Sequence, residues 1–264
     1  MSEIGFAERY REQMRLARRA ERTVEHWDAR AAHMSEGAFD GSYVRQFVAR
    51  MNLEGCATLL DVGCGPGTIG LSVAARLEHV HGLDFSPGML AALAENARSR
   101  GLANVTALQL AWEDDWSEVP TCDVVVASRS VMVPDLESAL LKLHSRARVR
   151  AYVTYPADGS VLPAAVRRVI GRGGNLLPDY LSVAGILHDL GFYPTLDYLP
   201  AKNRLASCTT FEALHAKVSE SLGALSDEES TRLRSYYDAN QGRVGLEPMR
   251  WALFSWEARE QTAR

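Results

Sequence analysis

The sequence predicts an α/β fold in which a mainly parallel sheet is covered by helices on both faces. Three observations support this prediction. Short, nearly continuous apolar runs of strand length alternate with longer segments whose apolar residues recur at helical spacing. The first run, Thr58–Val62, leads into a glycine-rich turn with glycines at 63, 65 and 67. The segment Arg250–Glu257 again has the composition of a buried strand.

The N-terminal part of the chain predicts helices. Residues 3–33 carry an apolar stripe at helical spacing and predict one or two helices. A glycine-containing break follows at Ser35–Gly37, and Tyr43–Met51 predicts a further helix with one apolar face. We therefore expect a helical cap or lid over residues 1–40, ahead of a main domain at 41–264.

The middle of the chain predicts alternating helices and strands. Expected helices are 66–77, 87–100, 134–147 and 180–190, and expected strands are 79–84, 104–110, 123–128, 149–155 and 192–199. Residues 207–240 predict two more helices, and Ser226–Glu229 predicts a capping box at the start of the second. A helical insertion at about 201–248 therefore precedes the last strand.

The glycine-rich turn is the first candidate for a ligand site. Glycine accepts a positive φ and has no side chain, so a ligand can approach the backbone closely. The turn also contains a formal GxGxxG at Gly65–Gly70, which by itself would suggest NAD. Asp61 ends the strand just before the turn, where its charge would repel a pyrophosphate but would suit a cationic ligand.

A second carboxylate stands at the expected end of the next strand. Asp84 follows Gly63 by 21 positions, a spacing at which a carboxylate can accept both ribose hydroxyls, as in dinucleotide folds. Taken alone, an acid at this place would be a turn or N-cap residue. Its pairing with the glycine turn favours ribose binding.

These two stretches resemble a known family. Asp61–Gly67, DVGCGPG, is similar to the first motif of class I S-adenosylmethionine-dependent methyltransferases, and Asp84–Met89, DFSPGM, is similar to their second. The resemblance covers about residues 40–200 plus the final strand. It implies a Rossmann-like, mixed seven-stranded sheet whose last strand is antiparallel and inserted between its neighbours. It also implies S-adenosylmethionine as cofactor, S-adenosylhomocysteine as product and in-line transfer of a methyl group.

The resemblance implies a set of cofactor contacts. They are Asp61, Gly63, Cys64, Gly65, Gly67, Asp84, Phe85, Met89, Trp112, Glu113 and Ser128. In many members an acid directly after the third strand binds the adenine amino group, whereas this chain has Ala111. Glu113 or Asp114 could replace that contact from the loop, and the backbone N–H of Trp112 could reach a ring nitrogen. Alternatively, this stretch is a helix start with a tryptophan anchored in the core.

Catalytic and acceptor residues are harder to assign. A general base is needed only if the acceptor is protonated, and the candidates are His26, Tyr43 and Tyr155. The candidate acceptor contacts are Trp27, Arg129 and Arg172. Each has an ordinary structural alternative: a core position for Trp27, an ion pair for Arg129, and a solvated helix end for Arg172.

The overall composition and net charge limit the classes of function that the sequence supports. The 264 residues are 47% hydrophobic and 23% charged with a net charge of −4, which gives no global indication of nucleic-acid or membrane binding. The absence of a spanning apolar run and the charged N-terminus lead us to expect a cytoplasmic protein. The four cysteines form no C-x-x-C pair, so no metal site is expected.

We therefore expect methyl transfer to a small-molecule acceptor, with no indication of the oligomeric state. Two alternatives stay open at this point: a non-catalytic S-adenosylmethionine-binding protein, and an NAD-dependent oxidoreductase. Asp61 and the inserted last strand argue against the oxidoreductase.

Overall fold

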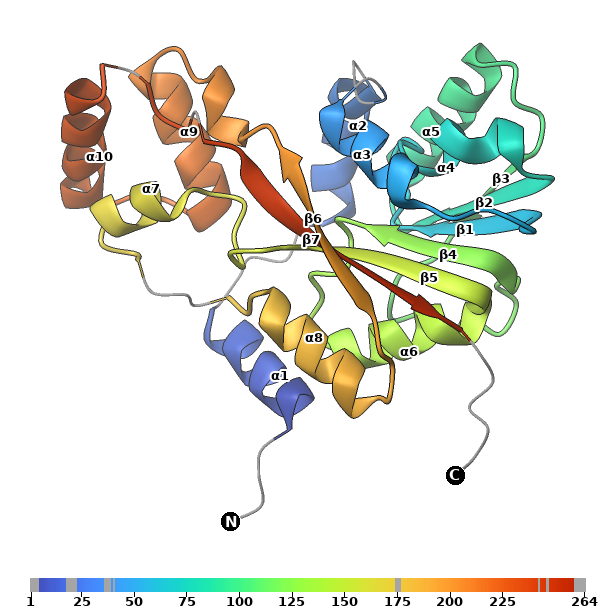
Figure 1. Cartoon of the computed structure of the whole chain (residues 1–264). Helices are drawn as coiled ribbons and strands as arrows, with labels where there is room; N and C mark the ends of the chain where they lie inside the picture. Colours follow the sequence, from blue (N-terminus) through green and yellow to red (C-terminus); the bar gives the residue numbers. More distant parts are fainter. Residues whose placement is uncertain are drawn as a thin grey trace.

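The architecture is a seven-stranded sheet in the order β3-β2-β1-β4-β5-β7-β6 (Figure 1). The computed structural model describes residues 5–17, 23–35, 39, 41–173, 177–241, 243–245 and 247–258. Glu36 and Gly37 of the predicted break lie outside the described residues. The strands are β1 (Thr58–Val62), β2 (His79–Asp84), β3 (Val105–Gln109), β4 (Cys122–Ser128), β5 (Ala147–Pro156), β6 (Thr195–Ala201) and β7 (Met249–Glu257). Strands β1 to β5 pair in parallel, and β7 is antiparallel to both β5 and β6. The predicted mixed sheet with an inserted antiparallel strand is confirmed.

Helices cover both faces of this sheet (Figure 1). On one face lie α3 (Ser42–Arg50), α4 (Gly70–Val73) and α5 (Pro87–Ser99); on the other lie α1 (Phe6–Leu16), α6 (Leu136–Arg146) and α8 (Tyr180–Asp189). Successive side chains of each strand point to opposite faces of the sheet. Separate hydrophobic clusters therefore form on the two faces, under the two helical layers. Leu60 of β1 belongs to the α6 side and Leu59 to the α3 side, as the strand period of two requires.

The helix expected at 66–77 is much shorter in the structure. The helix α4 begins only at Gly70 and passes into the 3₁₀ turn η1 (Ala74–Arg76). The backbone of Gly67 has φ +88°, outside the right-handed helical region, so the helix cannot start before it. Residues 66–69, which we predicted to be helical, therefore belong to the turn.

A second lobe stands beside the carboxyl end of β5 (Figure 1). It is built from two stretches that are far apart in sequence: α7 (Ala164–Val169) after β5, and the 3₁₀ turn η2 (Arg204–Ser207), α9 (Phe211–Leu222) and α10 (Asp227–Ala239) between β6 and β7. They share a hydrophobic cluster that includes Val166, Leu214 and Leu233. The predicted capping box forms at the start of α10, where Ser226 and Glu229 bond each other's backbone N–H groups.

The two N-terminal helices go to different places. Helix α1 packs on α6 and α8, below the sheet in Figure 1, whereas α2 (Val24–Ser35) packs on α5 at the opposite face. The expected cap is thus divided, and α2 is the part that lies near the carboxyl edge of the strands.

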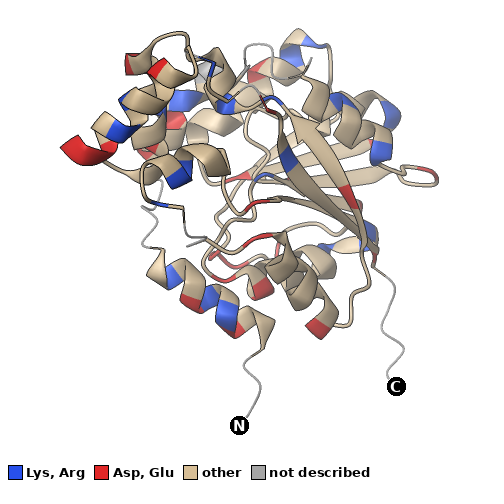
Figure 2. Ribbon diagram, turned by 60° about the vertical axis from the view of Figure 1, so that its left-hand side comes forward, with Lys and Arg blue, Asp and Glu red and all other residues tan. Residues whose placement is uncertain are grey.

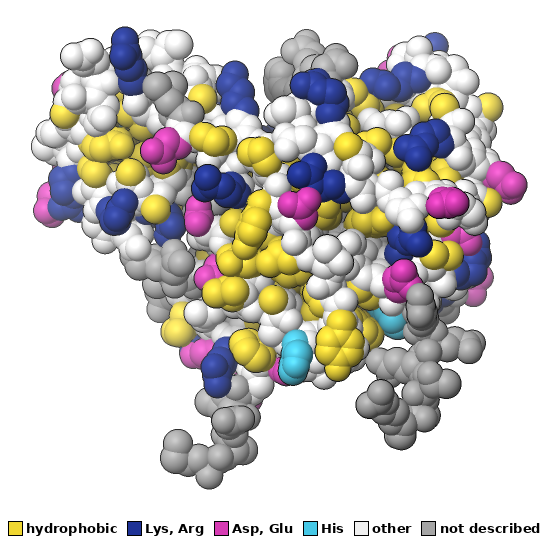
Figure 3. Space-filling view, viewed as in Figure 1, with side chains coloured by type: hydrophobic (Ala, Val, Ile, Leu, Met, Phe, Trp, Pro, Cys, Tyr) yellow, Lys and Arg dark blue, Asp and Glu magenta, His cyan; other side chains and the backbone are white. Residues whose placement is uncertain are grey.

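Charged side chains are spread over the surface, whereas several large apolar side chains are exposed together on one face. Figure 2 shows Lys and Arg distributed along the helices of both lobes and not gathered on one face. Figure 3 shows hydrophobic side chains in the centre of one face, over β6 and α8, where Leu181, Tyr193 and Tyr198 are exposed. No helix in the described part of the chain is long and apolar enough to span a bilayer.

Candidate active site

The glycine-rich turn after β1 has the backbone conformation that its residues allow. Gly63, Gly65 and Gly67 all have positive φ, at +62°, +54° and +88°. A Cβ on Gly63 would lie 2.3 Å from Cβ of Ser130, so the turn and the loop after β4 are in direct contact. A Cβ on Gly65 would meet only Sδ of Met89, at 3.8 Å. The outer side of Gly65 therefore leaves room for a ligand against the backbone.

Asp84 at the end of β2 ties the two predicted motifs together. Its Oδ2 accepts the N–H of Gly65 at 2.9 Å, and its Oδ1 accepts the N–H of Ser86 at 3.0 Å. Burial raises the pKa of Asp84, and the two N–H donors oppose that rise. Each carboxylate oxygen can accept a further hydrogen bond, so the carboxylate is held in place while its remaining lone pairs stay usable.

Asp61 is more deeply buried, with 2% of its surface exposed. Its Oδ2 accepts the N–H of Gly70 at 2.9 Å. Burial raises the pKa of Asp61 to about 7, because this single N–H only partly offsets the cost of removing a charge from water. A cationic group placed beside Asp61 would favour its charged form.

Three hydroxyls join α3 to the ends of β4 and β5. The hydroxyl of Tyr43 lies 2.8 Å from Oγ of Ser128 and 2.8 Å from Oγ1 of Thr154. Thr154 Oγ1 also accepts the backbone N–H of Arg129 at 2.9 Å. Burial raises the pKa of Tyr43, so this phenol stays protonated at neutral pH. Tyr43 was predicted as a candidate base, but its bonds to Ser128 and Thr154 were not predicted.

Arg129 follows β4 directly, beside the glycine turn. Its backbone has φ +62°, and its guanidinium carbon lies 4.6 Å from the ring centre of Tyr43. The next residue, Ser130, donates its hydroxyl to the carbonyl of Val62 at 2.7 Å. The predicted residues Ser128 and Arg129 are therefore brought against the motif at Asp61–Gly67.

Helix α2 is attached to both sides of this edge. Asp28 Oδ1 accepts the hydroxyl of Ser86 at 2.5 Å and the N–H of Gly88 at 2.9 Å, at the N-terminus of α5. Two residues later, Arg30 forms an ion pair with Glu220 of α9, in the second lobe. Helix α2 thus spans from the second motif to the second lobe. Neither Asp28 nor Arg30 was predicted, because their partners are 58 and 190 positions away.

His26 and Trp27 lie on the same helix. Both are half-buried, and their rings meet edge to face with centres 5.4 Å apart. They belong to α2, which contacts the second motif through Asp28.

The loop after β3 holds the predicted adenine contacts. Trp112 stacks on the buried Trp116, with ring centres 5.3 Å apart, and Glu113 is exposed. The N–H of Ala111 donates to Oδ2 of Asp114 at 2.7 Å, and Lys142 donates to the carbonyl of Trp112 at 2.6 Å. These bonds hold the segment as a loop, so it does not begin a helix as the alternative interpretation proposed. The other part of that interpretation is confirmed, because Trp116 is buried in the core.

Two candidate residues lie away from this group. Arg172 donates its Nε and Nη2 to Glu229 at 2.6 and 2.7 Å, and its Nη1 to the carbonyl of Leu222 at 2.7 Å. It therefore joins the loop after α7 to α9 and α10, and this placement does not support an acceptor contact. Tyr155 is fully buried in the cluster on the α6 side of the sheet.

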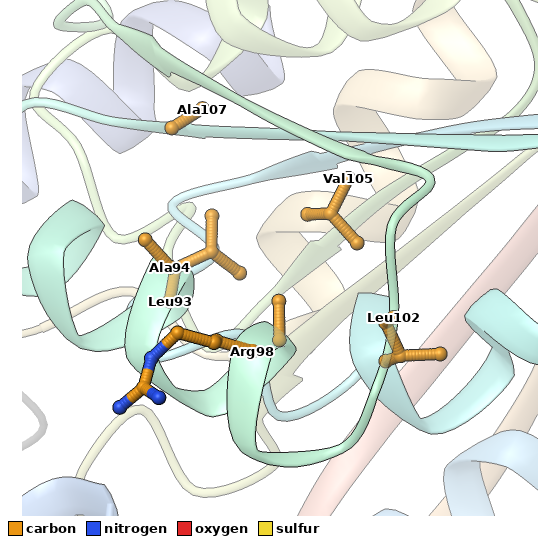
Figure 4. Close-up of a pocket in the computed structure, with 7 residues that line it drawn as sticks. Leu93, Ala94, Arg98, Leu102, Val105 and Ala107 are labelled. Carbon is orange, nitrogen blue, oxygen red and sulfur yellow. The ribbon is translucent and has the colours of Figure 1, made fainter.

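A separate pocket of about 250 Å³ lies between α5 and the edge strand β3 (Figure 4). It is lined by Leu93, Ala94, Ala97, Arg98, Leu102, Val105 and Ala107. It sits at the amino half of β3, away from the strand ends that carry Asp61 and Asp84. It is no part of the site described above.

The residues at the carboxyl edge fit S-adenosylmethionine. Asp84 offers two fixed carboxylate oxygens for the two ribose hydroxyls, Gly65 leaves backbone space beside them, and Phe85 is half-exposed next to Asp84. Asp61 offers a buried carboxyl for an ammonium group. A pyrophosphate fits less well, since it would have to lie between two carboxyls and the helix after the turn is only four residues long.

Comparison with known proteins agrees with this fit. Residues 59–148 match the methyltransferase domain family. An uncharacterized protein of Haemophilus influenzae is 32% identical over 96% of this chain and 97% of its own length. Trans-aconitate 2-methyltransferase of Mycobacterium tuberculosis is 36% identical over 111 residues, 40% of either chain. The crystal structure of YcgJ from Bacillus subtilis shares the fold, with a TM-score of 0.56 over 83% of this chain and 98% of that one at 13% identity.

The strand order, the glycine turn with its two carboxylates and the matched domain lead to one family. The chain belongs to the class I S-adenosylmethionine-dependent methyltransferases, and it is an enzyme that uses S-adenosylmethionine and releases S-adenosylhomocysteine.

Proposed function

We propose that this enzyme methylates a small molecule that binds under α2, between the ends of β4 and β5 and the second lobe. The observation that carries this proposal is the double attachment of α2. Asp28 fixes the helix to the start of α5, and Arg30 fixes it to Glu220 of the second lobe. An edge bridged in this way suits an acceptor that can be enclosed. The dispersed Lys and Arg side chains in Figure 2 favour no polymeric anion.

The cofactor would lie across the carboxyl ends of β2, β1 and β4. In this arrangement Asp84 accepts the ribose hydroxyls, Phe85 packs on the adenine and Asp61 faces the ammonium group. When bound, S-adenosylmethionine supplies an activated methyl group whose transfer leaves a neutral thioether, so no acid has to assist the leaving group. The chain's own contribution is orientation of the acceptor and exclusion of water.

The hydroxyls of Tyr43, Ser128 and Thr154 serve to hold the ends of β4 and β5 together. Tyr43 already shares its hydroxyl with both neighbours, and burial raises its pKa further from neutrality, so it is poorly suited to take a proton. If the acceptor must lose a proton, His26 on α2 is the better placed base among the predicted candidates, because it lies on the helix that bridges the site.

The test is a turnover screen with the full chain. Purified enzyme and S-adenosylmethionine are incubated with acceptor panels of carboxylic acids, phenols, amines, thiols, a peptide mixture and RNA, and S-adenosylhomocysteine is quantified by mass spectrometry. We expect product with at least one small-molecule class and none with peptides or RNA. Product with RNA or peptides alone, or tight cofactor binding without turnover of any acceptor, would overturn the proposal.

A further inference from the structure

The backbone of Arg129 is held in an uncommon conformation. Among the described non-glycine residues, only Arg129 and Gln241 have a positive φ. The left-handed region is unfavourable for a residue with a long side chain, and such a conformation persists only where the surroundings enforce it. The N–H of Arg129 donates to Thr154, while Ser130 donates to the carbonyl of Val62. The residue is therefore fixed from both β1 and β5.

The side chain that this backbone presents carries an unused charge. The guanidinium of Arg129 lies over the ring of Tyr43 and is exposed. It forms no hydrogen bond and no ion pair with another part of the chain that the structure describes. Three arginines of α2 and the second lobe differ from it, because Arg30, Arg172 and Arg204 are each paired with a carboxylate. The five N–H donors of Arg129 are thus available for an anion.

The order of the strands places this charge on the acceptor side. Asp84 on β2 and Asp61 on β1 provide the two carboxyls for the cofactor, and Arg129 follows β4, the next strand in the sheet. The ring under its guanidinium, Tyr43, bonds to β5 through Thr154 and packs on Trp251 of β7 at 6.0 Å. The guanidinium therefore lies on the side of the site formed by Tyr43, β5 and β7, and it is also close enough to Asp61 to help lower the pKa of that carboxyl.

The form of the guanidinium indicates the kind of anion. It is planar and holds its N–H donors in a fixed fork, so it binds a carboxylate through two parallel hydrogen bonds. Because Arg129 is exposed, this two-point geometry favours a carboxylate more than the charge alone does.

We propose that Arg129 binds a carboxylate of the methyl acceptor, so that the acceptor is a small carboxylic acid. This inference rests on the function proposed above. The same chemistry could come from the amino-acid carboxylate of the cofactor, and the experiment separates the two sources.

The variants are chosen so that the fold is kept. Arg129→Gly removes the guanidinium and suits the positive φ, so it relieves strain without disturbing the backbone. Arg129→Lys keeps the charge without the planar fork. Gln241→Gly is the matched control, because Gln241 has the only other positive φ among the described non-glycine residues and follows α10 in the second lobe.

The measurement is binding, independent of turnover. Calorimetry first gives the affinity of each variant for S-adenosylhomocysteine. The S-adenosylhomocysteine-saturated protein is then titrated with a panel of three- to six-carbon mono-, di- and tricarboxylic acids and with their methyl esters. We expect at least one acid, but not its fully esterified form, to bind the wild type. That affinity should fall at least tenfold in Arg129→Gly, fall less in Arg129→Lys and stay unchanged in Gln241→Gly, while the affinity for S-adenosylhomocysteine changes less than twofold.

Four binding results would overturn the inference. The first is equal binding of acids and their esters, and the second is equal binding of acids by the wild type and Arg129→Gly. The third is that no acid of the panel binds. The fourth is a loss of affinity confined to S-adenosylhomocysteine, which would assign Arg129 to the cofactor carboxylate. Turnover of phenols or amines alone would also overturn it while leaving the proposed function intact, whereas turnover of RNA or peptides alone would remove both.

Discussion

The carboxylate of Asp28 occupies the space that a side chain at position 88 would need. A Cβ built on Gly88 would lie 2.8 Å from Asp28 Oδ1 and 2.9 Å from Asp28 Cα. The N–H of Gly88 donates to that same Oδ1. Helix α2 therefore approaches the start of α5 at backbone distance, directly after the second motif.

Gly88→Ala should push α2 away from α5. Because the added methyl would meet the backbone as well as the carboxylate of Asp28, we expect a loss of about 1–3 kcal/mol in the free energy of unfolding. We also expect faster amide hydrogen exchange in Val24–Ser35. Urea titration and exchange mass spectrometry check the two effects.

The matched control compares Gly88→Ala, Asp28→Ala and the double variant that carries both changes. If the collision with Asp28 causes the loss, the double variant should lose clearly less than the sum of the two single variants, since their energies couple through direct contact. Additive losses would show that the methyl collides with the backbone of α2 and not with the carboxylate of Asp28.

Asp84→Ala should weaken binding of S-adenosylhomocysteine by about 2–3 kcal/mol, because two charge-assisted hydrogen bonds to ribose are lost. The same change frees the N–H groups of Gly65 and Ser86 that Asp84 now accepts. Calorimetric titration gives the affinity, and Glu118→Gln is the control, as an exposed acid after the Trp112 loop. Unchanged affinity in a folded Asp84→Ala would rule out the ribose contact.

The binding of S-adenosylhomocysteine should strengthen as the pH rises. The pKa of Asp61 is raised to about 7 in the unliganded protein, so most of this carboxyl is neutral at pH 6 and ionised at pH 8. If the ligand's ammonium group lowers that pKa well below 6, the affinity should be about tenfold higher at pH 8 than at pH 6. Calorimetry in two buffers of different ionisation enthalpy should register proton release near pH 6. Asp61→Asn should remove the pH dependence.

The same raised pKa has the opposite effect on stability without ligand. A folded-state pKa above the unfolded value means that the folded protein binds the proton more tightly. The contribution of Asp61 to stability is therefore fully present below about pH 4 and is lost as the pH rises through about 7. Asp61→Asn, which keeps an oxygen for the N–H of Gly70, should then raise the free energy of unfolding at pH 8 by about 1–4 kcal/mol. A lower stability at pH 8 in this variant would contradict the expectation.

Arg172→Ala should loosen the second lobe and leave the cofactor site intact. The change removes a bidentate ion pair with Glu229 and a bond to the carbonyl of Leu222, for an expected loss of about 1–3 kcal/mol in the free energy of unfolding. Affinity for S-adenosylhomocysteine should change less than twofold. Arg168→Ala, at a nearby exposed arginine, is the control for stability. A selective loss of acceptor binding with normal stability would restore the acceptor role predicted for Arg172.

The sheet and the two motifs could be predicted because their causes are local. Parallel strands buried on both faces must be apolar in their buried part, as Val124–Ala127 is, and a turn with repeated positive φ requires glycine. The capping box at Ser226 depends on residues only three positions apart. Such features leave patterns that a short window of sequence contains.

Contacts between distant segments left no such pattern. Asp28 reads as one more acid on a polar helix until the fold brings it to Gly88, and Arg172 reads as part of a basic loop until Glu229 meets it. The predicted helix at 66–77 was too long, because the apolar spacing continues through residues that the positive φ of Gly67 excludes from the helix. The bond partners of Tyr43 come from the ends of two strands more than 80 positions away.

The place of β7 between β5 and β6 has a consequence for how the chain is made. Strand β6 has no bond to the rest of the sheet except through β7, whose residues follow β6 by about fifty positions. During synthesis the outer edge of β5 therefore stays unpaired until the whole of the second lobe has left the ribosome and β7 follows. Pairing at such sequence separation is slow. We expect the glycine turn and its two carboxylates to reach their final geometry before the second lobe and β7 do. A nascent chain would then bind its cofactor before its acceptor site is complete.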